Sequence, residues 1–220
     1  MAMINPALMP SMPVLIFGGS GEGKSMSISG FQPPEVGVIA AEKPRLPFKS
    51  DIKVARIPEF PDARTMAQKH AAQYAWIINT IRSARCKSIV IDDSQYLMVN
   101  ELFDRAMEKG YDKYTEMAMN FRNLVHAVNT MQEPGKIVYF LHHAEFDADG
   151  KARAKTIGKM LDEKLVLEGL YDVVIYCKDK KFYTQGNGTS TAKTPIGMFS
   201  EIEIPNDLKA VDTAIRAYYG

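Results

Sequence analysis

The stretch VLIFGGSGEGKS, residues 14–25, decides the fold expected for this chain. Its first four residues form a short apolar run that stops at glycines, as a buried β-strand does. The remainder, from Gly18 to Ser25, fits the pattern G-x-x-x-x-G-K-[ST] in full. This pattern predicts a phosphate-binding loop, the P-loop, between a strand and a helix.

Each part of this motif has a physical role in holding a triphosphate. The glycines let successive backbone N–H groups point inward around the β- and γ-phosphates. Lys24 supplies a positive charge to the terminal phosphates, and the Ser25 hydroxyl is a Mg²⁺ ligand. The helix that begins there directs its positive dipole end at the same oxygens. We therefore expect ATP and Mg²⁺ as cofactors, with the nucleotide held by Gly18, Gly19, Ser20, Gly21, Glu22, Gly23, Lys24, Ser25 and Met26.

A second apolar run, Ile89–Val90–Ile91, ends in two acids, Asp92 and Asp93. In P-loop proteins an acid holds Mg²⁺ from the end of a neighbouring strand, which is the Walker B role. Asp92 follows the apolar run directly, so we predict it as that acid; a cap for the following helix is the alternative. For Asp93 three roles stay open, namely support of Asp92, a helix cap and the catalytic base.

Hydrolysis needs a group that orients or deprotonates the attacking water. Glu42 follows the strand expected over residues 36–41, and a carboxylate at that strand end can face the γ-phosphate across a water. The alternative is a solvated side chain in the charged tract Glu42–Lys43–Pro44–Arg45. The residues alone leave both readings of Glu42 open.

The apolar run over residues 137–141 ends at His142 and His143. A polar group at such a strand end can hydrogen-bond the γ-phosphate and report its presence, and histidine donates this bond in either protonation state. We predict one of the two as this sensor, with a structural role as the alternative. Metal binding is disfavoured, because adjacent strand residues point to opposite faces and no third ligand is evident.

Apolar strands alternate with helical segments along the chain, which predicts an α/β domain of the P-loop NTPase type with a mostly parallel sheet. We expect residues 1–12 to form a flexible arm and residues 13–220 a single domain. A loop is expected at 147–155 and a hairpin turn at 178–181. Strands are expected at 14–17, 36–41, 52–57, 88–91, 137–141, 172–177 and 182–185, and helices at 24–29, 65–83, 95–109, 113–132, 156–168 and 206–219.

The composition, 46% hydrophobic and 24% charged, is that of an ordinary globular protein. No apolar run approaches the ~20 residues needed to span a bilayer, and the N-terminus lacks a signal-peptide pattern. Cys86 and Cys177 form neither a disulfide framework nor a metal-binding pattern, so we expect a cytoplasmic protein. The formal net charge of +1 neither favours nor excludes nucleic acid.

Several segments together resemble a bacteriophage family of AAA/RecA-like ATPases: GGSGEGKS, the strand ending in Glu42, SIVIDD, YFLHHAE and GTSTAKTPIGMF. The resemblance covers most of the chain. It implies a RecA-like core, Mg²⁺-dependent ATP hydrolysis, a homo-oligomer, and work on single-stranded DNA in phage recombination or replication. By position it assigns phosphate and Mg²⁺ to Lys24 and Ser25, the Walker B role to Asp92, water activation to Glu42, and the sensor to the strand end at His142 and His143.

Lys193 lies in the hydroxyl-rich stretch 188–195, which we expect to be flexible. RecA-like filaments place a basic residue of one subunit at the γ-phosphate of the next, where it neutralises developing charge as an arginine finger does. The resemblance makes Lys193 a candidate for this role, and a solvated loop lysine is the equal alternative. No arginine accompanies it, whereas many relatives pair the two.

The cations Lys151, Arg153, Lys155 and Lys159 follow the histidine strand, where RecA-like proteins place DNA-contacting loops. A solvated helix start is the alternative, and no aromatic residues interleave with these cations to stack on bases. Two rival functions remain. A small-molecule kinase would want an arginine-rich lid, for which the chain offers Arg153. A nucleotide-dependent switch would bind a replication protein with little turnover.

Overall fold

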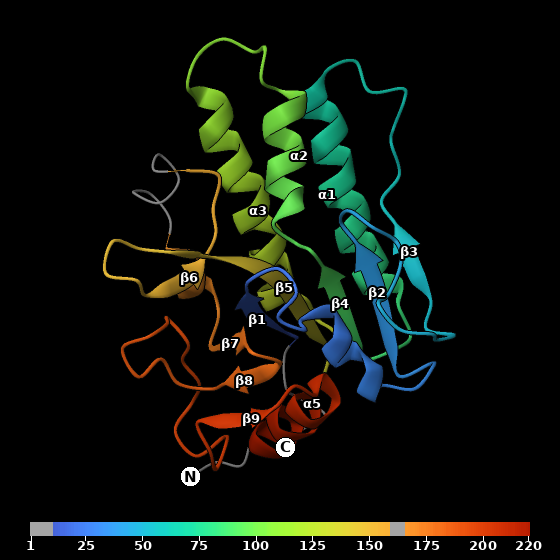
Figure 1. Cartoon of the computed structure of the whole chain (residues 1–220). Coiled ribbons are helices and arrows are strands. Elements are labelled where there is room, and N and C mark those ends of the chain that lie inside the picture. The colour runs from blue at the N-terminus through green and yellow to red at the C-terminus, as the bar shows by residue number, and fades with distance from the viewer. Residues whose placement is uncertain (1–10, 159–165) are drawn as a thin grey trace.

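The computed structural model describes residues 11–158 and 166–220 (Figure 1). These residues form a nine-stranded sheet in the order β3-β2-β4-β5-β1-β7-β8-β9, with β6 paired to the end of β5. The first five strands and β7 pair in parallel, whereas β6, β8 and β9 are antiparallel. The mostly parallel α/β sheet of a RecA-like P-loop fold is therefore confirmed. The strands are β1 (Met12–Gly18), β2 (Val36–Ala40), β3 (Val54–Arg56), β4 (Ser88–Asp92), β5 (Ile137–Phe146), β6 (Ala152–Ala154), β7 (Val173–Lys178), β8 (Lys181–Tyr183) and β9 (Glu203–Pro205).

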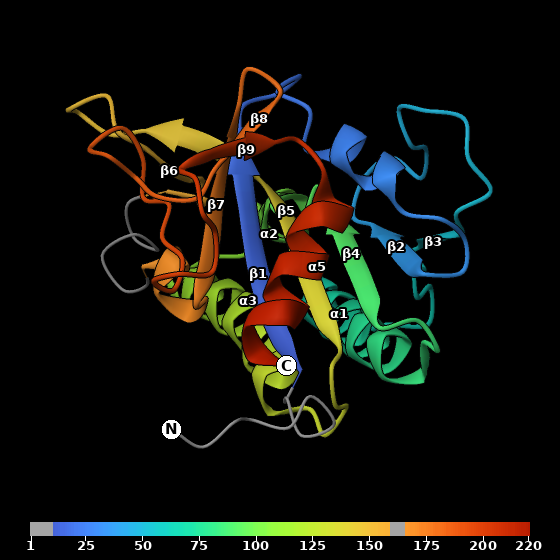
Figure 2. The ribbon, with the colours of Figure 1, turned by 90° about the horizontal axis from the view of Figure 1, so that it is seen from below.

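Helices cover both faces of the sheet. One face carries α1 (Met66–Ser83), α2 (Tyr96–Asp104) and α3 (Asp112–Thr130). The other face carries α5 (Leu208–Tyr219) and the 3-10 helix η2 (Ser25–Gly30), as the view from below shows (Figure 2). A second 3-10 helix, η3 (Leu167–Leu170), lies before β7. Within the described ranges, no helix is both long and apolar enough to cross a bilayer.

The central strand β1 shows why its sequence is continuously apolar. Leu15 and Phe17 enter the core under α1, α2 and α3, whereas Val14 and Ile16 enter the core under α5. All four side chains are fully buried. A strand covered on both faces needs apolar residues at every position, because successive side chains point to opposite sides.

A buried polar cluster ties α5 to the middle of the sheet. The Asp212 carboxylate accepts hydrogen bonds from the Tyr139 hydroxyl at 2.9 Å and the Ser88 hydroxyl at 2.7 Å. Arg216, one turn later on α5, donates to the same carboxylate at 2.7 Å. Because the carboxylate is buried and fully bonded, this cluster fixes the last helix on the sheet.

Two expectations near the end of β5 were wrong. The expected loop at 147–155 contains β6, in which Ala152 and Ala154 are buried and Arg153 is partly exposed. This alternation with period two is that of a half-covered strand, and it pairs with the extension of β5. The helix expected at 156–168 is absent at its described ends, since 156–158 are not helical and Leu167–Leu170 form a 3-10 turn. The centre of that helix lies outside the described residues.

Smaller differences concern the ends of elements. Met12, placed in the flexible arm, begins β1, and the Ser11 hydroxyl donates to the Met131 carbonyl at 2.9 Å. The rest of the expected arm lies outside the described residues. Helix α2 ends at Asp104 rather than at residue 109, and β9 was missed because it is a three-residue strand at the sheet edge.

Candidate functional site

The strand register brings the predicted site residues to one edge of the sheet. Gly18, at the end of β1, lies beside His143 of β5 and Cys177 of β7. Ala40, at the end of β2, lies beside Asp92 of β4. In open parallel sheets, ligands bind beyond the carboxyl ends of the strands. The P-loop and the acids that follow β2 and β4 therefore meet at the expected position.

The P-loop lysine is held under its own loop. Lys24 is 5% exposed, and its ammonium donates to the carbonyls of Gly18 at 2.9 Å and Gly19 at 2.8 Å. Burial lowers the pKa of Lys24, because the charged form loses hydration. A buried ammonium with neutral carbonyl partners is suited to an anionic ligand, which would provide the missing countercharge.

The residues predicted to hold Mg²⁺ are already in contact. The Ser25 hydroxyl donates to Asp92 Oδ1 at 2.8 Å. Burial raises the pKa of Asp92, and the bond from Ser25 partly offsets this effect. A hydroxyl and a carboxylate are the hard oxygen donors that Mg²⁺ prefers. The donor set of Ser25 and Asp92 therefore fits a magnesium site.

Asp93 forms a pair with His143 beside this site. Its backbone is left-handed, with φ of 56°, which is uncommon for a residue with a side chain. The Asp93 carboxylate lies 3.3 Å from Nε2 of His143, and this contact lowers the pKa of Asp93. Helix α2 begins without a side-chain cap, so Asp93 does not serve as its cap.

His142 points away from this pair. It is fully buried, with Nδ1 at 2.9 Å from the Ser94 hydroxyl and Nε2 donating to the Lys155 carbonyl at 2.7 Å. Burial lowers the pKa of His142 to about 4, so the ring is neutral near pH 7. Because both ring nitrogens have partners inside the fold, the geometry gives His142 a structural position and leaves His143 as the candidate sensor.

Glu42 is exposed at the rim of the site. Its carboxylate accepts a long hydrogen bond, 3.4 Å, from the Asn100 side chain. A carboxylate held this weakly is free to take a water as partner. The position is consistent with the predicted role in water activation.

The site residues surround one cavity of about 780 Å³ over the P-loop, within the range of small-molecule sites. Gly18, Gly19 and Glu22 do not line it; the first two hold Lys24, and Glu22 bonds to the turn between β7 and β8. The predicted residues in its wall are Ser20, Gly21, Gly23, Lys24, Ser25, Met26, Glu42, Asp92, Asp93 and His143.

Comparison with known proteins shows the family to which the chain belongs. Residues 11–196 match the family model AAA_24, described as an AAA domain. The chain belongs to this AAA domain family. It is thus a P-loop domain of the AAA ATPase type, in which ATP binding is the expected property.

Other comparisons are more distant. No curated protein matches this chain by sequence. A solved structure described as a prototypical ATPase from the type III secretion system of pathogenic bacteria is similar, with 14% identity and a TM-score of 0.47. The match covers 78% of this chain and 53% of that chain, so this AAA domain spans about half the length of that protein.

Sequence reasoning missed several residues in the wall of this AAA domain's cavity. Lys43 and Arg45 lie within three residues after Glu42, and their charges were a usable signal. No local pattern marks Lys180 or Asn206, which reach the cavity from the C-terminal part of the chain. The missed residues are Lys43, Arg45, Pro47, Tyr96, Lys180 and Asn206.

Lys193 does not line the cavity over the P-loop. Its backbone exchanges hydrogen bonds of 2.8 and 2.9 Å with Val174, near the start of β7. The P-loop instead follows the ends of the strands. The stretch expected to be flexible is therefore paired to the sheet, while the Lys193 side chain is exposed.

The basic stretch after β5 is less free than expected. Arg153 forms an ion pair with Glu145 at 2.7 Å, so one of the cations of this stretch has an acidic partner. Lys155 is exposed, and Lys159 lies outside the described residues.

Proposed function

We propose that this AAA domain hydrolyses ATP with Mg²⁺, and that Glu42 activates the attacking water. The observation that carries the proposal is the contact between Ser25 and Asp92 beside the buried Lys24, all on one cavity. Mg²⁺, when bound, would neutralise charge on the phosphates. Glu42 would take a proton from a water molecule. The oxygen of that water would attack the γ-phosphorus as the bond from phosphorus to the ADP oxygen breaks.

We assign the sensing of the γ-phosphate to His143. Its ring lines the cavity, and Asp93 accepts from Nε2 at 3.3 Å. With Nε2–H given to Asp93, the ring donates Nδ1–H to the phosphate in its imidazolium form, and Asp93 fixes the direction of that bond. In this proposal Asp93 positions His143, and Glu42 rather than Asp93 serves as the base.

Substitution of Glu42 tests this assignment. Glu42→Gln should leave the Kd for MgATP unchanged and lower kcat about 100-fold or more, because a positioned base contributes that much. Asp93→Asn is the matched control and should lower kcat less. Measurement of phosphate release decides between them: Glu42→Gln at full rate together with an inactive Asp93→Asn would move the base to Asp93.

We further propose that the turnover serves work on single-stranded DNA by an oligomer. The resemblance to phage AAA/RecA-like ATPases and the exposed Lys155 beyond the histidine strand support this step. Phosphate release measured with and without single-stranded DNA tests it. Stimulated turnover is the expected result. Tight nucleotide binding with negligible turnover would favour the switch, and phosphate transfer to a metabolite would favour the kinase.

For Lys193 we propose a role at the γ-phosphate of the neighbouring subunit. Its exposed side chain, which does not line the cavity over the P-loop, suits a contact made across an interface. A mixture of Lys193→Ala and Glu42→Gln proteins should then regain part of the ATPase activity, because some interfaces combine two intact residues. A mixture as inactive as its components would show that Lys193 has no such role and is a solvated surface lysine.

A further inference from the structure

The turn between β7 and β8 is fastened to the P-loop. Asp179 and Lys180 both have left-handed backbones, with φ of 52° and 58°, which is the conformation of a two-residue type I′ turn. The Lys180 N–H donates to the Glu22 carbonyl at 3.2 Å, and the Asp179 N–H donates to the Glu22 carboxylate. Cys177, at the end of β7, donates to the same carbonyl at 3.3 Å. These bonds hold the turn, distant in sequence, against the loop.

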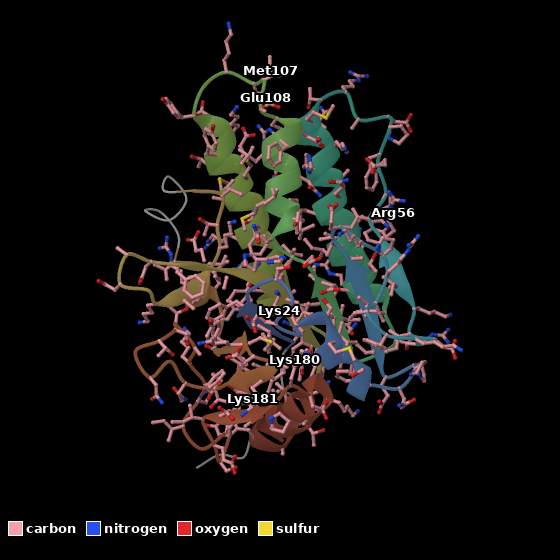
Figure 3. All side chains as sticks on the ribbon, in the orientation of Figure 1. Lys24, Arg56, Met107, Glu108, Lys180 and Lys181 are labelled. Atoms are coloured by element: carbon pink, nitrogen blue, oxygen red, sulfur yellow. The ribbon has the colours of Figure 1, made fainter. Side chains whose placement is uncertain are left out.

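The Lys180 side chain extends along the P-loop. A Cβ atom built on Gly23 would lie 3.6 Å from Cγ of Lys180, so the aliphatic stem of the lysine packs over that glycine. Lys180 and Lys24 line the same cavity, and both are labelled in Figure 3. Among the described residues, no acidic side chain forms an ion pair with the Lys180 ammonium.

The neighbouring lysine differs on each of these points. Lys181 forms an ion pair with Glu203 on β9, and it does not line the cavity. Both lysines are exposed and adjacent in sequence, so they share the same general environment. Lys180 differs from Lys181 because its side chain packs along the P-loop and because no acid among residues 11–158 and 166–220 pairs with it.

We propose that Lys180 is a second phosphate-binding lysine, which donates its ammonium to the phosphate chain of the bound nucleotide. The inference rests on the proposed function, since it requires a nucleotide in the P-loop. Lys24 would contact the terminal phosphates from beneath the loop, and Lys180 would contact the chain from the rim. The hydrogen bonds that the turn donates to Glu22 hold it in place before a ligand binds, which reduces the entropy lost when the ammonium meets phosphate.

Removal of the ammonium tests the proposal. Lys180→Gly deletes the side chain and suits the left-handed backbone, so the turn is retained. We expect the Kd for MgATP to rise about tenfold, the size of one charge-assisted hydrogen bond at a partly hydrated site. Lys181→Ala is the matched control and should bind like the wild type. Lys180→Arg keeps the charge and should recover most of the affinity.

Competition with inorganic triphosphate identifies which part of the nucleotide Lys180 contacts. Lys180→Gly should weaken inorganic triphosphate and MgATP by similar factors, because the two ligands share the phosphate chain. A loss confined to MgATP would place the contact at the base or ribose and overturn the assignment. Wild-type affinity in Lys180→Gly would overturn the role altogether. If neither the wild type nor Lys181→Ala binds MgATP, the proposed function fails and this inference fails with it.

Discussion

At the scale of single residues, the two adjacent histidines of β5 show how strand geometry separates roles. His143 faces Asp93 and the cavity, whereas His142 lies inside the fold between the Ser94 hydroxyl and the Lys155 carbonyl. Successive strand residues point to opposite sides, so the backbone itself assigns one ring to the site and the other to the core.

The buried ring of His142 makes stability depend on pH. Its pKa is about 4 in the folded protein, against ~6.5 in an unfolded chain. The unfolded chain therefore takes up a proton first, so the contribution of His142 is complete above pH ~6.5 and is lost toward pH ~4. We expect a loss of up to about 3 kcal/mol in unfolding free energy from this group.

Urea denaturation between pH 7 and pH 4 measures this effect. His142→Gln keeps an amide donor and acceptor but cannot take up the proton, so its unfolding free energy should fall less steeply with acid. The other titrating groups are common to both proteins and cancel in the comparison. Equal slopes for the two proteins would show that His142 is not a neutral buried ring.

Local motifs explain what could be predicted at this scale. Lys24, Ser25 and Asp92 were found because each belongs to a pattern of neighbouring residues, and the structure brings them together. The sequence did not distinguish His142 from His143. Which of the two faces the cavity depends on how the helices cover the two faces of β5. Lys180 had no local signal, because its position comes from pairing between distant segments.

At the scale of elements, two contacts from the C-terminal part of the chain hold the P-loop: one from Asn206 and one from the β7–β8 turn. We call them the clamp. The Asn206 side chain, just before α5, donates to the Gly23 carbonyl at 3.0 Å. The β7–β8 turn bonds to Glu22 on the other side. The alternation of strands and helices and the hairpin turn at 178–181 were predicted correctly. The contact of these elements with the loop was not, because it depends on the order of strands in the sheet.

This clamp predicts different outcomes for two glycines of the loop. Gly23 has φ of 105°, and a Cβ atom there would lie 2.4 Å from Nδ2 of Asn206. Gly21 has φ of 80° with open space around it. Both substitutions by alanine strain the backbone by about 1–2 kcal/mol, but Gly23→Ala must also displace the clamp.

Titration with MgATP should show a larger loss of affinity for Gly23→Ala than for Gly21→Ala. Near-ultraviolet circular dichroism of both variants serves as the control for overall folding. Equal losses would indicate that backbone strain alone matters and that Asn206 does not determine the shape of the loop.

At the scale of the whole molecule, α5 covers one face of the sheet. Its attachment combines an apolar core with the buried cluster of Asp212, Tyr139, Ser88 and Arg216. The helix itself was predicted, over residues 206–219. The burial of Asp212 was not, because two of its partners, Ser88 of β4 and Tyr139 of β5, are far away in sequence.

Removal of this acid should destabilise the whole fold. Asp212→Ala leaves a buried tyrosine hydroxyl and the Arg216 guanidinium without their shared acceptor, at a cost of about 3 kcal/mol. Tyr139→Phe removes a single bond to that acceptor and should cost about 1 kcal/mol. Chemical denaturation followed by circular dichroism measures both. A cost for Asp212→Ala no larger than for Tyr139→Phe would mean that α5 is held by its apolar contacts alone.

The central claim is that the loop from Gly18 to Ser25 binds MgATP through Lys24. Isothermal titration calorimetry of the wild type and of Lys24→Ala tests it most directly. The account predicts saturable binding of one MgATP per chain by the wild type, and at least ~100-fold weaker binding by a folded Lys24→Ala protein. Absence of binding by the wild type, or unchanged affinity in Lys24→Ala, would contradict the account.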